Sequence, residues 1–124
     1  MTVRDFVPKK VIGKGSYGTV CLVQKKDTGG VYAMKAVRKS NSSRTILERD
    51  ILVSMGKSSP WVAKIFFTFQ DSENSYFVME YLLGGEFLGL LVAHNTLSED
   101  ATRFYMAELL SAIESLHKLD YIHR

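Results

Sequence analysis

Three glycines and a lysine near the beginning of the chain have types and spacing that suit phosphate binding. Gly13, Gly15 and Gly18 follow the pattern GxGxxG, and Val20 comes two residues later. Because glycine has no Cβ atom, such a loop can fold closely over a phosphate chain and direct backbone N–H groups at its oxygens. The pattern therefore predicts a phosphate-binding loop, and a plain glycine-rich hairpin is the alternative.

The residues after Gly18 distinguish between two kinds of glycine-rich loop. In dinucleotide-binding folds the third glycine of the pattern opens a helix. Here it is followed by residues 19–24, a β-branched and apolar run that favours a strand. We therefore expect a strand–turn–strand hairpin, which counts against a dinucleotide site.

Lys35 ends a second apolar run, residues 31–35. On a strand, Val31, Ala33 and Lys35 share one face by period-2 alternation. A lysine on the face of a small alanine can reach a cleft covered by the glycine loop and pair with phosphates; an exposed strand lysine is the ordinary alternative. Glu48 is the expected partner of Lys35, and its alternative is a solvent-exposed helix pair.

Most of the first eighty residues are predicted to form strands, with one helix among them. The expected helix runs from about Arg44 to Met55, with Ser43 as its cap. We expect an antiparallel sheet of five strands with this helix packed on it, over residues 6–82. Its clearest strands are 19–24, 31–37, 65–70 and 76–81, with connections at 27–30 and 71–75.

After Gly85 the pattern changes to helical. Residues 86–93 indicate a short helix, and Ser98 is placed to cap a long one that ends near Leu119. The apolar residues of the long helix cover a wide arc, broader than a surface helix needs. This predicts either a helix surrounded by others or a surface, within residues 98–119, for a hydrophobic protein partner.

Composition narrows the class of protein further. The chain has 124 residues and a net charge of +3, with its charges scattered, so a nucleic-acid partner is not expected. The single cysteine, Cys21, suits a reducing compartment, cytoplasmic or nuclear. No apolar run is long enough for a signal peptide or a membrane span, so no membrane partner is expected either.

Taken together, these motifs resemble the eukaryotic protein kinase family over essentially the whole chain. Residues 13–20 fit the loop pattern GxGxxGxV, Val31–Lys35 fits the lysine strand, and His123-Arg124 fits the first letters of HRD. The detail resembles the AGC group of serine/threonine kinases, and within it the microtubule-associated and nuclear Dbf2-related branches. The segments that carry this finer resemblance are Glu48–Leu52, Ser59–Lys64, Phe69–Asp71, Met79–Tyr81 and Gly84–Glu86.

The resemblance implies an α+β fold in three parts. A protein-kinase-like N-lobe, with five antiparallel strands and one helix, spans residues 6–82. Residues 83–85 form a hinge, and residues 86–124 begin a helical C-lobe that is incomplete. Residues 1–124 would thus be a partial protein kinase domain.

The resemblance also implies an ATP site. Ile12 and Val20 would cover the adenine with Ala33 beside them, and Met79 would be the gatekeeper at the back of the pocket. The Glu80 carbonyl and the Leu82 N–H would bond the adenine edge, while Glu86 would reach the ribose. Lys35, held by Glu48, would contact the phosphates together with the loop residues Gly13, Lys14, Gly15, Ser16, Tyr17 and Gly18.

Two departures from the family pattern bear on activity. Glu48 follows Lys35 by 13 positions, a shorter spacing than the resemblance implies. The sequence ends at Arg124, one residue before the expected catalytic Asp, and the Mg²⁺ ligands of the family are not present. We therefore expect the ATP-binding portion of a kinase that transfers the γ-phosphate to protein Ser/Thr hydroxyls, inactive by itself. A non-catalytic partner-binding chain and another class of nucleotide-binding enzyme are the alternatives.

Overall fold

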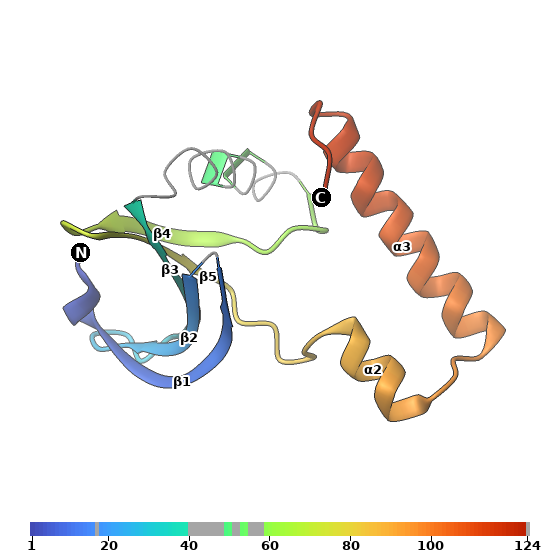
Figure 1. Cartoon of the computed structure of the whole chain (residues 1–124), viewed down its shortest axis with the longest axis horizontal. Coiled ribbons are helices and arrows are strands. Elements are labelled where there is room, and N and C mark those ends of the chain that lie inside the picture. Colours follow the sequence, from blue (N-terminus) through green and yellow to red (C-terminus); the bar gives the residue numbers. More distant parts are fainter. Residues whose placement is uncertain (17, 40–48, 51–52, 55–58, 124) are drawn as a thin grey trace. The chain divides into compact units, whose positions relative to one another are not determined.

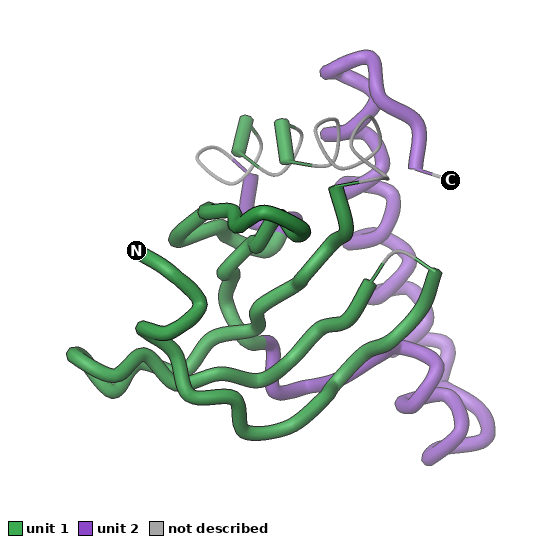
Figure 2. Tube along the Cα trace, turned by 60° about the vertical axis from the view of Figure 1, so that its left-hand side comes forward, with its two compact units in different colours: residues 1–58, 63–81 green, residues 59–62, 82–124 purple. Residues whose placement is uncertain are grey.

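The computed structural model describes residues 1–16, 18–39, 49–50, 53–54 and 59–123. It divides into two compact units, residues 1–58 with 63–81, and residues 59–62 with 82–124 (Figure 2). The elements of the first unit are η1 (Val3–Asp5), β1 (Phe6–Gly15), β2 (Gly18–Lys25), β3 (Val31–Arg38), β4 (Ile65–Gln70) and β5 (Asn74–Met79). The second unit contains α2 (Phe87–His94) and α3 (Glu99–His117).

The first unit is built on one curved sheet with the order β1-β2-β3-β5-β4, in which every neighbouring pair is antiparallel (Figure 1). The predicted five-stranded antiparallel sheet is confirmed. Gly18 begins a strand, as the β-branched residues after it predict, and does not begin a helix. Of the helix expected over residues 44–55, Arg49, Asp50, Val53 and Ser54 are helical; its other residues and the cap Ser43 lie outside the described residues.

The connection between β4 and β5 is tighter than the sequence indicates. The strand expected over 76–81 begins earlier, at Asn74, and ends at Met79. The reason is the Asp71 side chain, whose Oδ1 accepts from the backbone N–H groups of Glu73 and Asn74 at 2.8 and 2.7 Å. An aspartate that bonds the backbone two residues on replaces a longer loop by a compact turn.

The main hydrophobic cluster of the first unit lies on one face of the sheet, and Ala33, Val37 and Phe77 are buried on the other face. Phe69 links the members of the cluster, stacking on Tyr76 with ring centroids 5.0 Å apart and on Phe6 at 5.8 Å. Aromatic and β-branched side chains fit such a pleated, half-buried surface. The buried members are Phe6, Val23, Met34, Tyr76 and Val78, with Cys21, Tyr32, Ala36, Phe67 and Phe69 packed against them.

The second unit holds the two helices that follow Gly85. Ser98 caps α3, as predicted, with its side-chain oxygen accepting from the N–H of Ala101 at 3.2 Å. The helix ends at His117, before the predicted Leu119, where a turn with Asp120 at φ 60° follows. Neither α2 nor α3 contains a buried residue. Among the described residues, no helix is long and apolar enough to cross a membrane.

Candidate functional site

The glycine-rich segment is the tip of the hairpin formed by β1 and β2. Gly13 lies opposite Val20, and Lys14, one position nearer the tip, lies opposite Thr19. The pair nearest the turn joins Gly15 to Gly18, and Ser16 is exposed beyond it. Tyr17 lies outside the described residues. Ile12 falls at a register shift between Val11 and Gly13 and is 39% exposed.

Gly18 has a structural role that the sequence did not reveal. Its φ is +134°, a conformation that L side chains rarely adopt. A Cβ at this position would overlap the carbonyl oxygen of Ala36 and lie 3.1 Å from its carbonyl carbon. The absence of a side chain therefore lets the hairpin pack directly against the backbone of β3, in addition to any approach to a ligand.

Two rows of paired residues cross the sheet beneath this hairpin. In the first row Lys35 of β3 lies opposite Val20 of β2 and Phe77 of β5. In the second row Ala33 lies opposite Leu22 and Met79. Directly opposed residues of antiparallel strands point to the same side, and residues two apart on one strand do too. Four predicted site residues thus share one face: Val20, Ala33, Lys35 and Met79.

This face is the reverse of the core face, because neighbouring residues alternate. Met34, between Ala33 and Lys35, belongs to the core, as does Val78 beside Met79. On the candidate face Ala33 is 6% exposed, while Val20, Lys35 and Met79 are half-buried. A small apolar floor next to a lysine can accept a planar apolar group with a charged extension.

Glu80 makes a two-bond contact at the end of this face that the sequence reasoning missed. Its backbone N–H donates to the Lys64 carbonyl oxygen at 3.0 Å. Its side-chain Oε1 accepts from the Lys64 N–H at 2.9 Å. The two residues are 16 positions apart, and only the pairing of β4 with β5 brings them together, so no local pattern could have indicated the contact.

Three other predicted site residues either lie in the second unit or fall outside the described residues. Glu48, the expected partner of Lys35, lies outside the described residues. Leu82, which is 61% exposed, and Glu86 belong to the second unit. Glu86 is the N-cap residue of α2, where its side chain makes no capping hydrogen bond.

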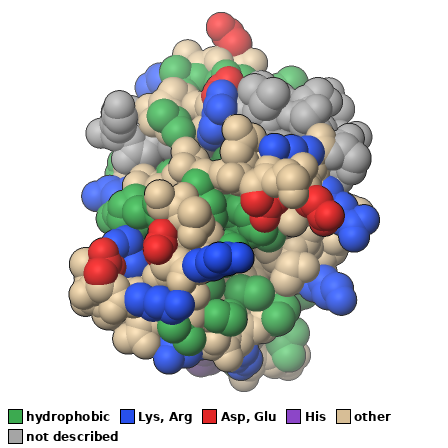
Figure 3. Space-filling view, turned by 90° about the vertical axis from the view of Figure 1, so that its left-hand side faces the viewer, with side chains coloured by type: hydrophobic (Ala, Val, Ile, Leu, Met, Phe, Trp, Pro, Cys, Tyr) green, Lys and Arg blue, Asp and Glu red, His purple; other side chains and the backbone are tan. Residues whose placement is uncertain are grey.

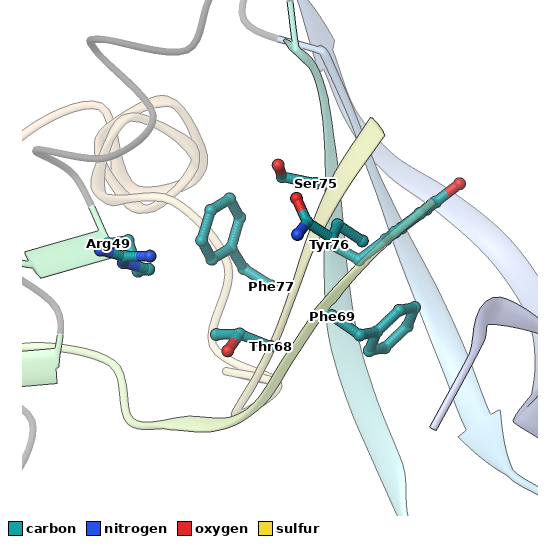
Figure 4. Close-up of a pocket in the computed structure, with 7 residues that line it drawn as sticks. Arg49, Thr68, Phe69, Ser75, Tyr76 and Phe77 are labelled. Atoms are coloured by element: carbon teal, nitrogen blue, oxygen red, sulfur yellow. The ribbon is translucent and has the colours of Figure 1, made fainter. Parts of the chain in front are cut away.

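A cavity of about 190 Å³ lies against β4 and β5 of the first unit, and Phe77, which lies opposite Lys35, is one of its lining residues. Phe77 and Thr68 project from the strands toward Arg49, and Phe69 projects to the opposite side (Figure 4). No residue of the predicted nucleotide site lines it; the lining residues are Arg49, Thr68, Phe69, Gln70, Ser75, Tyr76 and Phe77.

In the described part of the first unit, Asp27, Asp71 and Tyr76 have shifted pKa values, and the two aspartates lie in connections between strands. The Tyr76 hydroxyl donates to Asp71 at 2.7 Å, which lowers the pKa of that carboxyl and raises the pKa of the phenol. The Lys25 ammonium likewise lowers the pKa of Asp27 by its hydrogen bond.

On the face seen in Figure 3, lysine and arginine side chains lie in several separate places among hydrophobic ones.

Comparison with known proteins gives consistent matches. The family described as the protein kinase domain matches residues 6–124. The serine/threonine-protein kinase CBK1 of Eremothecium gossypii is 47% identical, over 100% of this chain and 18% of its own length. CBK1 of Saccharomyces cerevisiae is also 47% identical, over 100% of this chain and 17% of its own length.

An insect relative gives the same result. The serine/threonine-protein kinase tricornered of Drosophila pseudoobscura is 48% identical, over 98% of this chain and 28% of its own length. Each of these relatives is named as a serine/threonine-protein kinase, the class that the sequence motifs indicate. The chain therefore spans less than a third of the length of each of these three relatives.

Proposed function

Because the chain belongs to the protein kinase family, we propose that its sheet unit holds ATP for a serine/threonine kinase. The reaction proposed for the whole protein is transfer of the γ-phosphate to Ser or Thr hydroxyls of a protein substrate. In the terms of this family, the sheet corresponds to the N-lobe, and α2 and α3 to the beginning of the C-lobe.

One observation carries this proposal: the shared face of Val20, Ala33, Lys35 and Met79 beside the glycine hairpin. The adenine would lie on the apolar part of this face, between Val20 and Ala33, with Met79 limiting its depth. Lys35 would extend toward the α- and β-phosphates as a point charge. Backbone N–H groups of residues 16–18 would donate to the remaining phosphate oxygens.

The remaining contacts follow from the family pattern. The Glu80 carbonyl and the Leu82 N–H would bond the adenine edge, Glu86 would bond the ribose, and Glu48 would hold Lys35. Mg²⁺ is a family-level expectation. Within the described ranges no three His, Cys, Asp or Glu side chains gather as a metal site, so no step is assigned to the metal here.

The 124 residues alone should bind ATP weakly and transfer no phosphate, because they contain the phosphate-holding groups without the Asp base that the family pattern places after HR. An assay with radiolabelled ATP and a peptide tests this. Turnover above background that disappears in Lys35→Met, with contaminating kinases excluded by mass spectrometry, would contradict it.

The binding site is tested by titrating the ¹⁵N-labelled chain with ATP. Binding is monitored through the amide chemical shifts of the glycine hairpin. Lys35→Ala should weaken binding at least about tenfold, because the loss of one charge-assisted contact removes about 1.5–3 kcal/mol. Lys26→Ala, an exposed lysine of the 25–30 turn, is the matched control and should bind like the wild type. Equal affinities in all three proteins would contradict the proposal.

The exposed apolar side chains of α2 and α3 favour a second candidate function, the binding of a hydrophobic protein partner. Leu88 and Val92 of α2 are 65% and 75% exposed, and Phe104 and Leu110 of α3 are 58% and 62% exposed. Exposed apolar residues in such numbers mark an interaction surface or an aggregation hazard. This role does not exclude the first.

A further inference from the structure

We propose that the carboxylate of Glu80 is a positioning group that anchors the backbone from which its own carbonyl would contact the adenine. This inference rests on the proposed function, which takes that carbonyl as an adenine contact. It goes further by assigning a role to the side chain, which does not itself touch the nucleotide.

The two bonds between Glu80 and Lys64 form a closed ring. The Glu80 N–H donates to the Lys64 carbonyl at 3.0 Å, and the Lys64 N–H donates to the Glu80 carboxylate at 2.9 Å. Both polar backbone groups of Lys64 are thus paired with a single residue.

This ring lies just beyond the ordinary sheet ladder. The last ladder pair on this side joins Ile65 to Met79, and a register shift separates it from the pair at Phe67. Without the carboxylate, the backbone of residue 80 would have one hydrogen bond to Lys64, just before β4. Next to an irregular pair, it would then fray as strand ends do. The carboxylate supplies the second bond where the sheet stops.

The two bonds restrain the Glu80 Cα atom from two sides. The hydrogen bond of the N–H restrains the Cα–N bond, and the hydrogen bond of the carboxylate restrains the Cα–Cβ bond through the side chain. Together they limit where the carbonyl carbon lies, whereas rotation about the Cα–C bond sets the direction of the C=O group. The carbonyl carbon of Glu80 is therefore held near one position before a ligand arrives, which reduces the ordering cost of binding.

Two substitutions separate the hydrogen bond from the side chain's bulk and charge. Glu80→Gln keeps an oxygen that can accept from Lys64, whereas Glu80→Ala removes it. Glu73→Ala, at the exposed β4–β5 turn, is the control for loss of a negative charge from the same unit. Urea unfolding of each variant, followed by sheet circular dichroism, shows whether the first unit stays folded under the assay conditions.

Two probes then separate the adenine end of the site from the phosphate end. Adenosine has no phosphates, and inorganic tripolyphosphate has no adenine. The chain is titrated with each, and the amide exchange rate of Lys64 is measured in the same samples. In Glu80→Ala, adenosine affinity should fall about three- to tenfold and Lys64 exchange should accelerate by a similar factor, as expected for one lost hydrogen bond. Tripolyphosphate affinity should not change.

Glu80→Gln, the conservative variant, should behave like the wild type in both measurements, adenosine affinity and Lys64 amide exchange. Glu80→Gln and Glu73→Ala should keep adenosine affinity within about twofold of the wild type, with slow exchange at Lys64 in Glu80→Gln. Wild-type adenosine affinity in Glu80→Ala, an equal loss in Glu80→Gln, or a parallel loss of tripolyphosphate binding would overturn the inference and leave the proposed function standing. A wild-type chain that binds neither adenosine nor ATP would overturn both.

Discussion

Gly18 and Ala36 lie so close together that a Cβ on Gly18 would overlap the carbonyl oxygen of Ala36. Gly18→Ala should therefore destabilise the first unit by about 2–4 kcal/mol, because a steric overlap with backbone adds to the cost of an unfavourable φ. Urea unfolding followed by circular dichroism measures the change.

Gly29→Ala is the matched control for this substitution. Gly29 also has a positive φ, +72°, but a Cβ there would meet only the flexible Gln24 side chain, at 3.7 Å. Its cost should be the conformational part alone, about 1–2 kcal/mol. Equal losses in the two variants would mean that the contact with Ala36 contributes nothing.

Met79→Gly should enlarge the proposed adenine pocket. Met79 lies opposite Ala33 on the candidate face, so its removal opens space for a group attached to the adenine amine. N6-benzyl-ATP should then bind about tenfold more tightly than ATP, since burial of an added apolar group contributes about 1.5–3 kcal/mol. The measurement is the same titration used for ATP.

Met34→Gly is the control for the gain in affinity for N6-benzyl-ATP. Met34 is 8% exposed and belongs to the core on the opposite face. It should lose stability, as buried methionines do when truncated, without any preference for the bulky nucleotide. The same preference in both variants, or in neither, would show that Met79 does not border the adenine.

The bond from Tyr76 to Asp71 should make stability depend on pH. Because this bond and two backbone N–H groups lower the pKa of Asp71 from 3.8, the carboxylate stabilises the fold above that value. The contribution is lost as the pH falls from 3.8 through the lowered pKa of the folded state.

Urea midpoints between pH 6 and pH 2 test this dependence. The wild-type midpoint should fall more steeply below the unfolded pKa of 3.8 than that of Asp71→Asn, which has no carboxylate to protonate. Tyr76→Phe, which removes the largest cause of the lowered pKa, should give an intermediate slope. Parallel curves for the three proteins would exclude the proposed linkage.

The exposed apolar side chains of α2 and α3 should make residues 1–124 self-associate or bind a hydrophobic partner. Each large side chain left uncovered forgoes about 1.5–3 kcal/mol of burial. Sedimentation should show concentration-dependent association of the full chain, and a shorter version that ends at Leu83 should stay monomeric. In the full chain, Leu110→Lys should reduce association, because Leu110 is 62% exposed. A monomeric full chain at high concentration would contradict this prediction.

Local patterns were sufficient for most of the strands, the hairpin and the family, although β5 begins and ends two residues earlier than they predict. Period-2 alternation depends only on the residues of one strand, so Ala33 and Lys35 could be placed on a common face from the sequence. The run of strand formers after Gly18 likewise predicted a hairpin, and the cap at Ser98 needed only the residues beside it. The family match over residues 6–124 agrees with these local assignments.

The tertiary structure alone determined which residues meet across strands. The pairing of Val20 with Lys35, and of Ala33 with Met79, depends on the register of separate strands, which no residue specifies by itself. The same holds for Gly18 against Ala36, and for Glu80 bonded to Lys64 at a separation of 16 residues. Contacts of this kind arise because the chain returns on itself, and the energies that select them come from packing across the whole sheet.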